Sequence, residues 1–286
     1  MIIQLRAQQK GPPVPDSSPT VPGQVPSNGI DTTTAHSARI WNYWLGGKDN
    51  YAVDREIGDQ FCGIFPEIVD IARASRGFLT RAVEYMAREA GIRQFLDIGT
   101  GLPTHDNTHE VAQRVAPDSR VVYVDNDPLV LAHARALLVG HTEGGTEFID
   151  ADLHDPDKIL AAAGETLDLT RPVGLMLMNI LGHVGDLSEA RSITARLLAA
   201  LPSGSHLAIA DGTNVVKGKE FDEAIAIWNE AGSVAYNLRT PEQIASFFDG
   251  LELVEPGVVS CPYWRPAVAL NPGREVDEFC AVGRKP

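Results

Sequence analysis

Three apolar segments of the sequence each end on an aspartate, whose carboxylate can bind hydroxyl and amine groups. The run in FLDIGTG ends on Asp97, the run in VVYVDND on Asp125, and the run in FIDADLHD on Asp152. Short runs of β-branched and aromatic residues predict buried strands. Because open α/β sheets bind ligands at the carboxyl ends of their strands, we expect the three carboxylates to serve one shared ligand.

The first segment continues into a turn formed by Gly99, Thr100 and Gly101. The two glycines permit positive φ and let the backbone approach a ligand closely. Residues 104–107 offer candidate N-caps for the next helix, whose free N–H groups would face a carboxylate-bearing ligand. A dinucleotide fingerprint needs glycine or alanine where the chain has Thr104, so the sequence disfavours NAD without excluding it.

The second and third aspartates lie where a nucleoside would need them. Asp125 follows the glycine turn by about 24 residues, close to the spacing at which Rossmann-like proteins hold ribose hydroxyls with an acid. Its neighbour Asn126 is predicted to belong to the same site. Asp152 and Leu153 place an acid beside an apolar residue, which suits the exocyclic amine and the flat face of an adenine.

Taken together, FLDIGTG, VYVDND and DADL resemble the pattern of class I S-adenosylmethionine-dependent methyltransferases. The strings ARIWNYWLGGKDNYAVDREIGD, RQFLDIGTGLPTHDNTHEVAQ and SFFDGLELVEPGVV resemble a narrower actinobacterial family, formerly catalogued as a domain of unknown function and assigned to these methyltransferases by fold. The likeness runs from about Ser37 to the C-terminus. It implies the fold and S-adenosylmethionine as cofactor, and it does not imply an acceptor.

The most specific part of this resemblance is WNYWLGGKDNY, in which a polar run follows a double glycine. Composition alone favours a short helix whose aromatic residues pack on the core. The resemblance favours a lid that closes over the cofactor and the acceptor. On that interpretation, four side chains line the pocket: Tyr43, Lys48, Asn50 and Tyr51.

A cation for the carboxylate of the cofactor is expected on the helix before the first strand. That helix, predicted over residues 67–91, carries Arg76 in the string RASRGFL. In proteins of similar fold the corresponding helix approaches the methionine carboxylate, which an arginine fork binds bidentately. The other arginines of the helix are expected to lie on its solvent face.

A fourth buried strand, PVGLMLMNI, leads into LGHVGD and places Asn179 and His183 at a further strand end. His183 is a candidate general base, since the unperturbed pKa of imidazole suits proton transfer at neutral pH. The alternative, a loop histidine bonded to backbone, is equally open. The histidines show no recognised metal-binding spacing, and no metal is predicted.

The order of elements predicts one Rossmann-like α/β sheet of seven strands. Five alternating strand–helix units are followed by LELVEPGVV and DEFCAVGRK, a closing antiparallel hairpin at the sheet edge. We divide the chain into a disordered proline-rich tail over residues 1–34, a helical cap or lid over 35–91, and a methyltransferase domain over 92–286. The aromatic residues between the last two strands are expected either to shape the acceptor pocket or to cover the sheet edge.

Bulk composition narrows the partners. The 286 residues carry a net charge of −14, which argues against nucleic acid. Three cysteines without CxxC spacing fit free thiols in a reducing cytoplasm. No signal peptide and no apolar run of about 18 residues is visible, so a cytoplasmic protein without a membrane span is expected.

The sequence therefore predicts an S-adenosylmethionine-dependent methyltransferase acting on a small-molecule acceptor. Two alternatives remain open at this point. One is a non-catalytic sensor that binds S-adenosylmethionine or S-adenosylhomocysteine, and the other is an NAD-linked oxidoreductase. The sequence does not identify the acceptor, the methylated atom or the oligomeric state.

Overall fold

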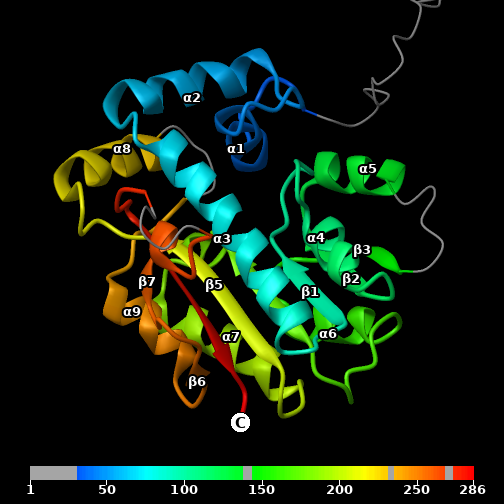
Figure 1. Ribbon diagram of the computed structural model, residues 1–286. Helices are drawn as coiled ribbons and strands as arrows, with labels where there is room; N and C mark the ends of the chain where they lie inside the picture. The colour runs from blue at the N-terminus through cyan, green and yellow to red at the C-terminus, as the bar shows by residue number, and fades with distance from the viewer. Residues whose placement is uncertain (1–30, 138–143, 231–234, 268–272) are drawn as a thin grey trace, which may run out of the picture.

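A computed structural model describes residues 31–137, 144–230, 235–267 and 273–286. Most of the predicted tail, residues 1–30, lies outside the described residues. The described chain forms a twisted sheet with helices on both faces and a further layer of helices across one end (Figure 1). Each part follows from the distribution of apolar residues along the sequence.

The sheet contains five parallel strands and an antiparallel edge. Its order is β3-β2-β1-β4-β5-β8-β6, and β8 runs antiparallel to β5. This confirms the predicted Rossmann-like sheet with a reversed C-terminal edge. The strands are β1 (Gln94–Ile98), β2 (Arg120–Asp125), β3 (Thr146–Asp150), β4 (Gly174–Met178), β5 (His206–Gly212), β6 (Glu252–Leu253), β7 (Val259–Ser260) and β8 (Glu278–Arg284).

The edge of the sheet differs from the predicted simple hairpin. The segment LELVEPGVV forms two short strands, β6 and β7, which both pair with β8. Pro256 and Gly257 separate them, and proline interrupts a strand because it has no N–H to donate. Eight strand segments thus occupy seven positions across the sheet.

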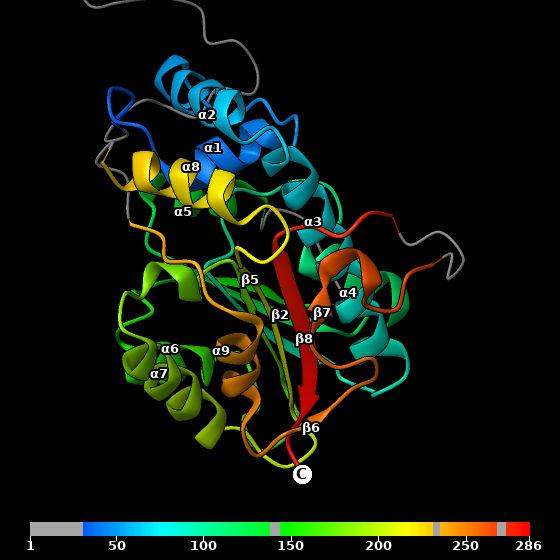
Figure 2. The same ribbon diagram turned by 90° about the vertical axis from the view of Figure 1, so that its left-hand side faces the viewer.

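Helices α3 and α4 cover one face of the sheet, and α6, α7 and α9 cover the other (Figure 2). The helices are α1 (Ser37–Trp44), α2 (Ala52–Ile64), α3 (Ile68–Arg88), α4 (Thr108–Val115), α5 (Pro128–Leu137), α6 (Pro156–Ala163), α7 (Leu187–Ala199), α8 (Gly218–Glu230) and α9 (Pro241–Ala245). Short 3-10 turns include η1 (Leu181–His183).

Alternation along β1 decides which side chain reaches the site. Leu96 and Ile98 pack in the core beneath α6 and α7, whereas Phe95 packs in the core beneath α3. Successive side chains of a strand point to opposite faces, so Asp97 lies on the α3 side. The strand end therefore carries its carboxylate toward the helix that contains Arg76.

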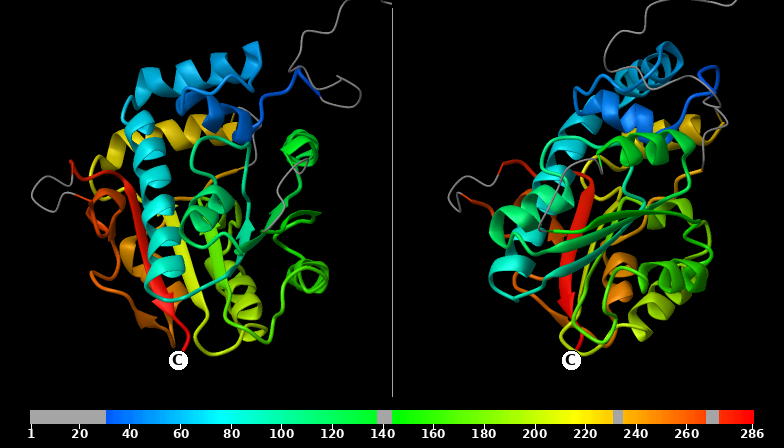
Figure 3. Two further views of the ribbon diagram at one scale, coloured as in Figure 1. Left: turned by 45° about the vertical axis from the view of Figure 1, so that its right-hand side comes forward. Right: turned by 90° about the vertical axis from the view of Figure 1, so that its right-hand side faces the viewer.

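A separate helical layer lies across the carboxyl ends of the strands (Figure 3). Helices α1, α2 and α8 share with the start of α3 an aromatic core that includes Trp44, Phe61 and Trp228. Phe65 stacks on Phe221 with ring centroids 4.5 Å apart, which joins α2 to α8. The layer thus combines the predicted N-terminal cap with a helix from much later in the chain.

Candidate functional site

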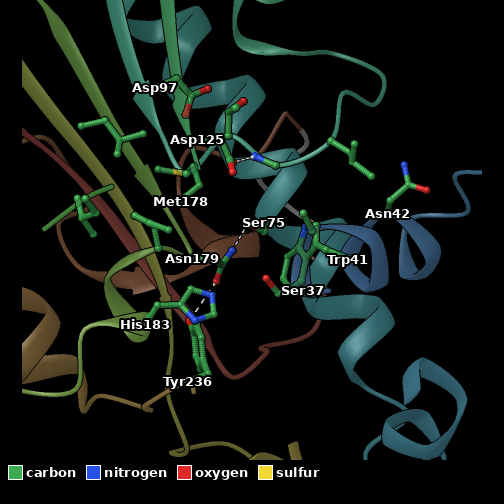
Figure 4. Close-up of a pocket in the computed structure, with 18 of the residues that line it drawn as sticks. Ser37, Trp41, Asn42, Ser75, Asp97, Asp125, Met178, Asn179, His183 and Tyr236 are labelled. Carbon is green, nitrogen blue, oxygen red and sulfur yellow. Dashed lines mark hydrogen bonds between the residues drawn. The ribbon is translucent and has the colours of Figure 1, made fainter. Parts of the chain in front are cut away.

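A cavity of about 290 Å³ lies between the strand ends and the helical layer (Figure 4). Its volume is near the lower end of the range typical of ligand pockets. All the residues predicted for cofactor binding, and the predicted base, line it. They are Arg76, Asp97, Gly99, Thr100, Gly101, Asp125, Asn126, Asp152, Leu153, Asn179 and His183.

Asp97 is a buried carboxyl group at the end of β1. Its Oδ2 accepts a hydrogen bond of 2.6 Å from the hydroxyl of Thr108, the first residue of α4. Burial raises the pKa of Asp97 to about 6, against the opposing effects of the Thr108 hydrogen bond and the nearby Arg76. The charge of this carboxyl group therefore changes near pH 6.

The glycine turn is fixed to the end of the neighbouring strand. Gly99 and Gly101 have φ values of 74° and 64°, which side chains rarely adopt. The Gly101 N–H donates to Oδ2 of Asp125 at 2.9 Å, while Oδ1 accepts from the backbone N–H of Asp127 at 2.9 Å. A Cβ on Gly99 would lie 2.6 Å from the side chain of Ile180, so the turn requires glycine there.

Arg76 supplies the cation of the cavity wall. Within the described residues, no hydrogen bond or ion pair engages its guanidinium. Burial lowers its pKa, and the charge of Asp97 opposes that change. Because a desolvated guanidinium without a partner is costly, its position fits a ligand carboxylate.

Asp152 and Leu153 lie just beyond β3, which ends at Asp150 and not at Asp152 as the sequence suggested. Oδ2 of Asp152 accepts from the Asn126 amide at 3.1 Å. Its Oδ1 accepts from the backbone N–H of His154 at 2.9 Å. Leu153 is buried, so an acid and an apolar surface lie side by side in the wall.

Asn179 is held by two hydrogen bonds from its amide nitrogen. Nδ2 donates to Ser75 Oγ and to Glu278 Oε1, each at 2.9 Å, and the residue has a φ of 54° (Figure 4). Burial raises the pKa of Glu278 to about 8. Oδ1 lies 3.4 Å from the Tyr236 hydroxyl, and its second lone pair is available to a ligand.

His183 has one nitrogen bonded and one available. Its Nδ1 lies 2.9 Å from the carbonyl oxygen of Ala235, so Nδ1 carries the proton. Burial lowers the pKa of the imidazole, which favours the neutral ring. The backbone hydrogen bond expected of a loop histidine is thus present, and it leaves the lone pair of Nε2 able to accept a proton.

Tyr236 is a cavity residue that the sequence did not reveal. Its hydroxyl donates to the buried Asp211 and accepts from the Gly212 N–H at 3.0 Å, and its ring lies 5.1 Å from that of His183. A Cβ on Gly182 would lie 2.4 Å from the tyrosine ring. The only signal in the sequence was Asp211 at a predicted strand end.

The four predicted lid residues do not line the cavity. Tyr43 donates its hydroxyl to Asp59 at 2.7 Å, and Lys48 is exposed. Tyr51 packs near Leu102 and Leu129. The placement differs from the expectation because the polar run folds back on its own helix.

Asn42 organises that fold. Its Oδ1 accepts from the Asp49 N–H at 3.1 Å and from the Asn50 amide at 3.0 Å. Asn50 also donates to the carbonyl of Gly47 at 3.0 Å. The residues of α1 that line the cavity are Ser37, Ala38, Trp41, Asn42 and Trp44.

No three or more of the described His, Cys, Asp and Glu side chains are grouped so as to hold a metal ion. Within the same residues, no helix is long and apolar enough to cross a membrane.

Trp264, one of the aromatics between the last strands, packs on Phe78 with ring centroids 5.3 Å apart. It is fully buried against α3 and is not a cavity residue.

The reversed last strand, and the glycine turn flanked by Asp97 at the end of β1 and Asp125 at the end of β2, define the class I methyltransferase type. A DUF574 family protein from Streptomyces avermitilis is 47% identical, over 90% of this chain and 99% of that one, with a TM-score of 0.85. A protein from Thermobifida fusca assigned as a methyltransferase is 38% identical, over 91% and 98%, with a TM-score of 0.84.

The model of the S-adenosyl methyltransferase family matches residues 23–286, and the chain belongs to that family. It is a methyltransferase, and S-adenosylmethionine is its cofactor. No curated protein matches the chain.

Proposed function

We propose that the protein methylates a small-molecule acceptor, bound in the cavity beside S-adenosylmethionine. The observation that carries the proposal is the meeting, in one cavity, of an unpaired Arg76, the acids of the strand ends and a neutral His183. The helical layer lies across the strand ends, and a cavity of this size suits a small molecule better than a polymer.

The residues present fit the cofactor from end to end. Arg76 is assigned to its carboxylate, and the glycine turn with Asp97 to the rest of the methionine part. Asp125 is assigned to the ribose hydroxyls, since each carboxylate oxygen can accept a second hydrogen bond besides its backbone contact. Asp152 is assigned to the exocyclic amine of adenine, and Leu153 to the face of the ring.

The bound cofactor supplies a methyl group already activated by the sulfonium charge. The protein's task is then to orient the acceptor and to receive its proton. Nε2 of His183 takes that proton from a hydroxyl or amine, whose lone pair forms the bond to the methyl carbon. Asn179, fixed by Ser75 and Glu278, offers Oδ1 to the same region.

Calorimetric titration with S-adenosylhomocysteine tests the cofactor assignment. Asp125→Asn is expected to weaken binding by about 10- to 100-fold, because hydrogen bonds to a charged group contribute about 1.5–3 kcal/mol. Asp150→Asn is the matched control, since Asp150 pairs in register with Asp125 but is exposed and outside the cavity wall. Equal losses in both variants, or none in Asp125→Asn, would contradict the assignment.

A further inference from the structure

The cavity extends from the polar strand ends into the helical layer, where its wall changes character. Six apolar side chains form this part, which we call the aromatic chamber: Trp41, Trp44, Phe61, Phe221, Ile225 and Trp228. They come from α1, α2 and α8. Trp44 lies 5.2 Å from Phe61 and 6.1 Å from Trp228 between ring centroids, so the rings form one continuous surface.

Charge is distributed unevenly around the cavity. Among the described residues that line it, those contributed by α1, α2 and α8 carry no charged side chain. The charged members, Arg76 and the three aspartates, belong to α3 and to the strand ends. A charged ligand group in the aromatic chamber would lose its hydration without gaining an ionic partner, which is costly.

Polar groups gather where the two parts meet. Figure 4 shows Ser37 and Trp41 of α1 across the cavity from His183, Tyr236 and Asn179. His183 lines this junction, and its Nδ1 bond to the Ala235 carbonyl leaves Nε2 unprotonated. An acceptor bound in the chamber would direct its reacting group toward this junction.

We propose that the acceptor is a compact, uncharged aromatic molecule methylated on a hydroxyl group, with its ring in the aromatic chamber. This inference rests on the proposed function. A hydroxyl fits better than an aliphatic amine, because such an amine is cationic at neutral pH and would be disfavoured by the chamber.

The acceptor hydroxyl, His183 and the methyl group of the cofactor account for every proton and electron pair in this reaction. The hydroxyl proton passes to Nε2 of His183, and the oxygen lone pair forms a bond to the methyl carbon. The bond between that carbon and sulfur breaks, and its electron pair remains on sulfur. The products are a methyl ether and S-adenosylhomocysteine, and His183 returns the proton to solvent.

Three probes with the same phenol ring test the charge requirement: 4-ethylphenol, tyramine and 4-hydroxyphenylacetate. Three of the four tryptophans line the chamber, while Trp264 is buried elsewhere, so tryptophan emission reports occupancy. With S-adenosylhomocysteine present, 4-ethylphenol is expected to bind at least about tenfold more tightly than either charged probe. With S-adenosylmethionine it should yield the methyl ether. Tighter binding of tyramine or of the anion would overturn the proposal.

A matched pair of variants on α8 tests the location. Ile225 lines the chamber, whereas Ile227 is 46% exposed on the same helix. Ile225→Asp is expected to weaken 4-ethylphenol binding at least about tenfold, and Ile227→Asp to leave it unchanged. Equal effects would contradict the location.

Calorimetry with S-adenosylhomocysteine separates the cofactor assignment from the acceptor class. Retained binding of this product by the parent protein, together with failure of the phenol predictions, would overturn only the acceptor class. Loss of that binding in the parent would instead overturn the proposed function. If Ile225→Asp does not fold, the comparison of the three probes on the parent protein still decides the acceptor class.

Discussion

Asp97 joins the carboxyl end of β1 to the start of α4 through its hydrogen bond with Thr108. Its pKa of about 6, raised by burial, lies above the ordinary value of 3.8. Mild acid therefore removes the charge of this carboxylate. It lies in the cavity assigned to a cofactor that carries a sulfonium cation.

Affinity for S-adenosylmethionine is therefore expected to fall as pH decreases through about 6, because protonated Asp97 no longer attracts a cation. Thr108→Val should move the midpoint to higher pH, since it removes a hydrogen bond that lowers this pKa. Asp97→Asn should bind weakly and with much less pH dependence. Calorimetric titrations across this range provide the measurement, and an unchanged midpoint in Thr108→Val would contradict the interpretation.

Among the elements, the loop after α1 gives a sharp test because two glycines predict opposite outcomes. A Cβ on Gly47 would lie 2.4 Å from the buried side chain of Asn42, whereas a Cβ on Gly63 in α2 would meet nothing within 4 Å. Gly47→Ala should destabilise the protein by about 1–3 kcal/mol. Gly63→Ala should be neutral or stabilise it by up to about 1 kcal/mol.

Urea unfolding of the two variants measures these changes. Titration of the same two variants with 4-ethylphenol tests whether the loop supports the site, because Asn42 and Trp41 both line the cavity. Gly47→Ala is expected to weaken acceptor binding as well as stability. Equal stability of the two variants would show that the Asn42 contacts do not hold the loop.

Local patterns predicted the elements that carry the cofactor side of the site. The runs before Asp97 and Asp125 form the expected buried strands. The site residues on these elements follow from topology, because parallel strands bring their carboxyl ends to one edge of the sheet.

Other features depended on contacts between distant residues and were not predictable. Nothing local in Tyr236 indicates that Gly182 makes room for its ring or that Asp211 accepts its hydroxyl. The hydrogen bonds by which Asn42 holds the polar run against α1 were likewise not visible in the sequence. The contribution of α8 to the helical layer likewise arises from packing on α2.

For the whole molecule, the buried Glu278 links stability to pH. Burial raises its folded-state pKa from 4.5 to about 8, so the native protein retains a proton that the unfolded chain loses in this interval. Stability should consequently decrease as pH rises from about 5 to about 8. Other buried acids, Asp97 and Asp211 among them, have raised pKa values and contribute with the same sign.

Glu278→Gln should reduce this slope, because the amide cannot ionise while its oxygen still accepts from Asn179. Urea unfolding at several pH values gives the comparison with the parent protein. A variant slope equal to that of the parent would show that Glu278 does not retain its proton.

The two sides of the cavity are encoded by separate segments of the gene. The cavity-facing walls of the helical layer are encoded mainly by α1 and α8, at residues 37–44 and 218–230, while the three acidic strand ends fall within residues 97–152. Mutations in the two outer segments reshape one side of the cavity and leave the codons for the other side intact. With the acceptor in the aromatic chamber, as proposed, selection for a new acceptor can proceed without repeated loss and recovery of cofactor binding.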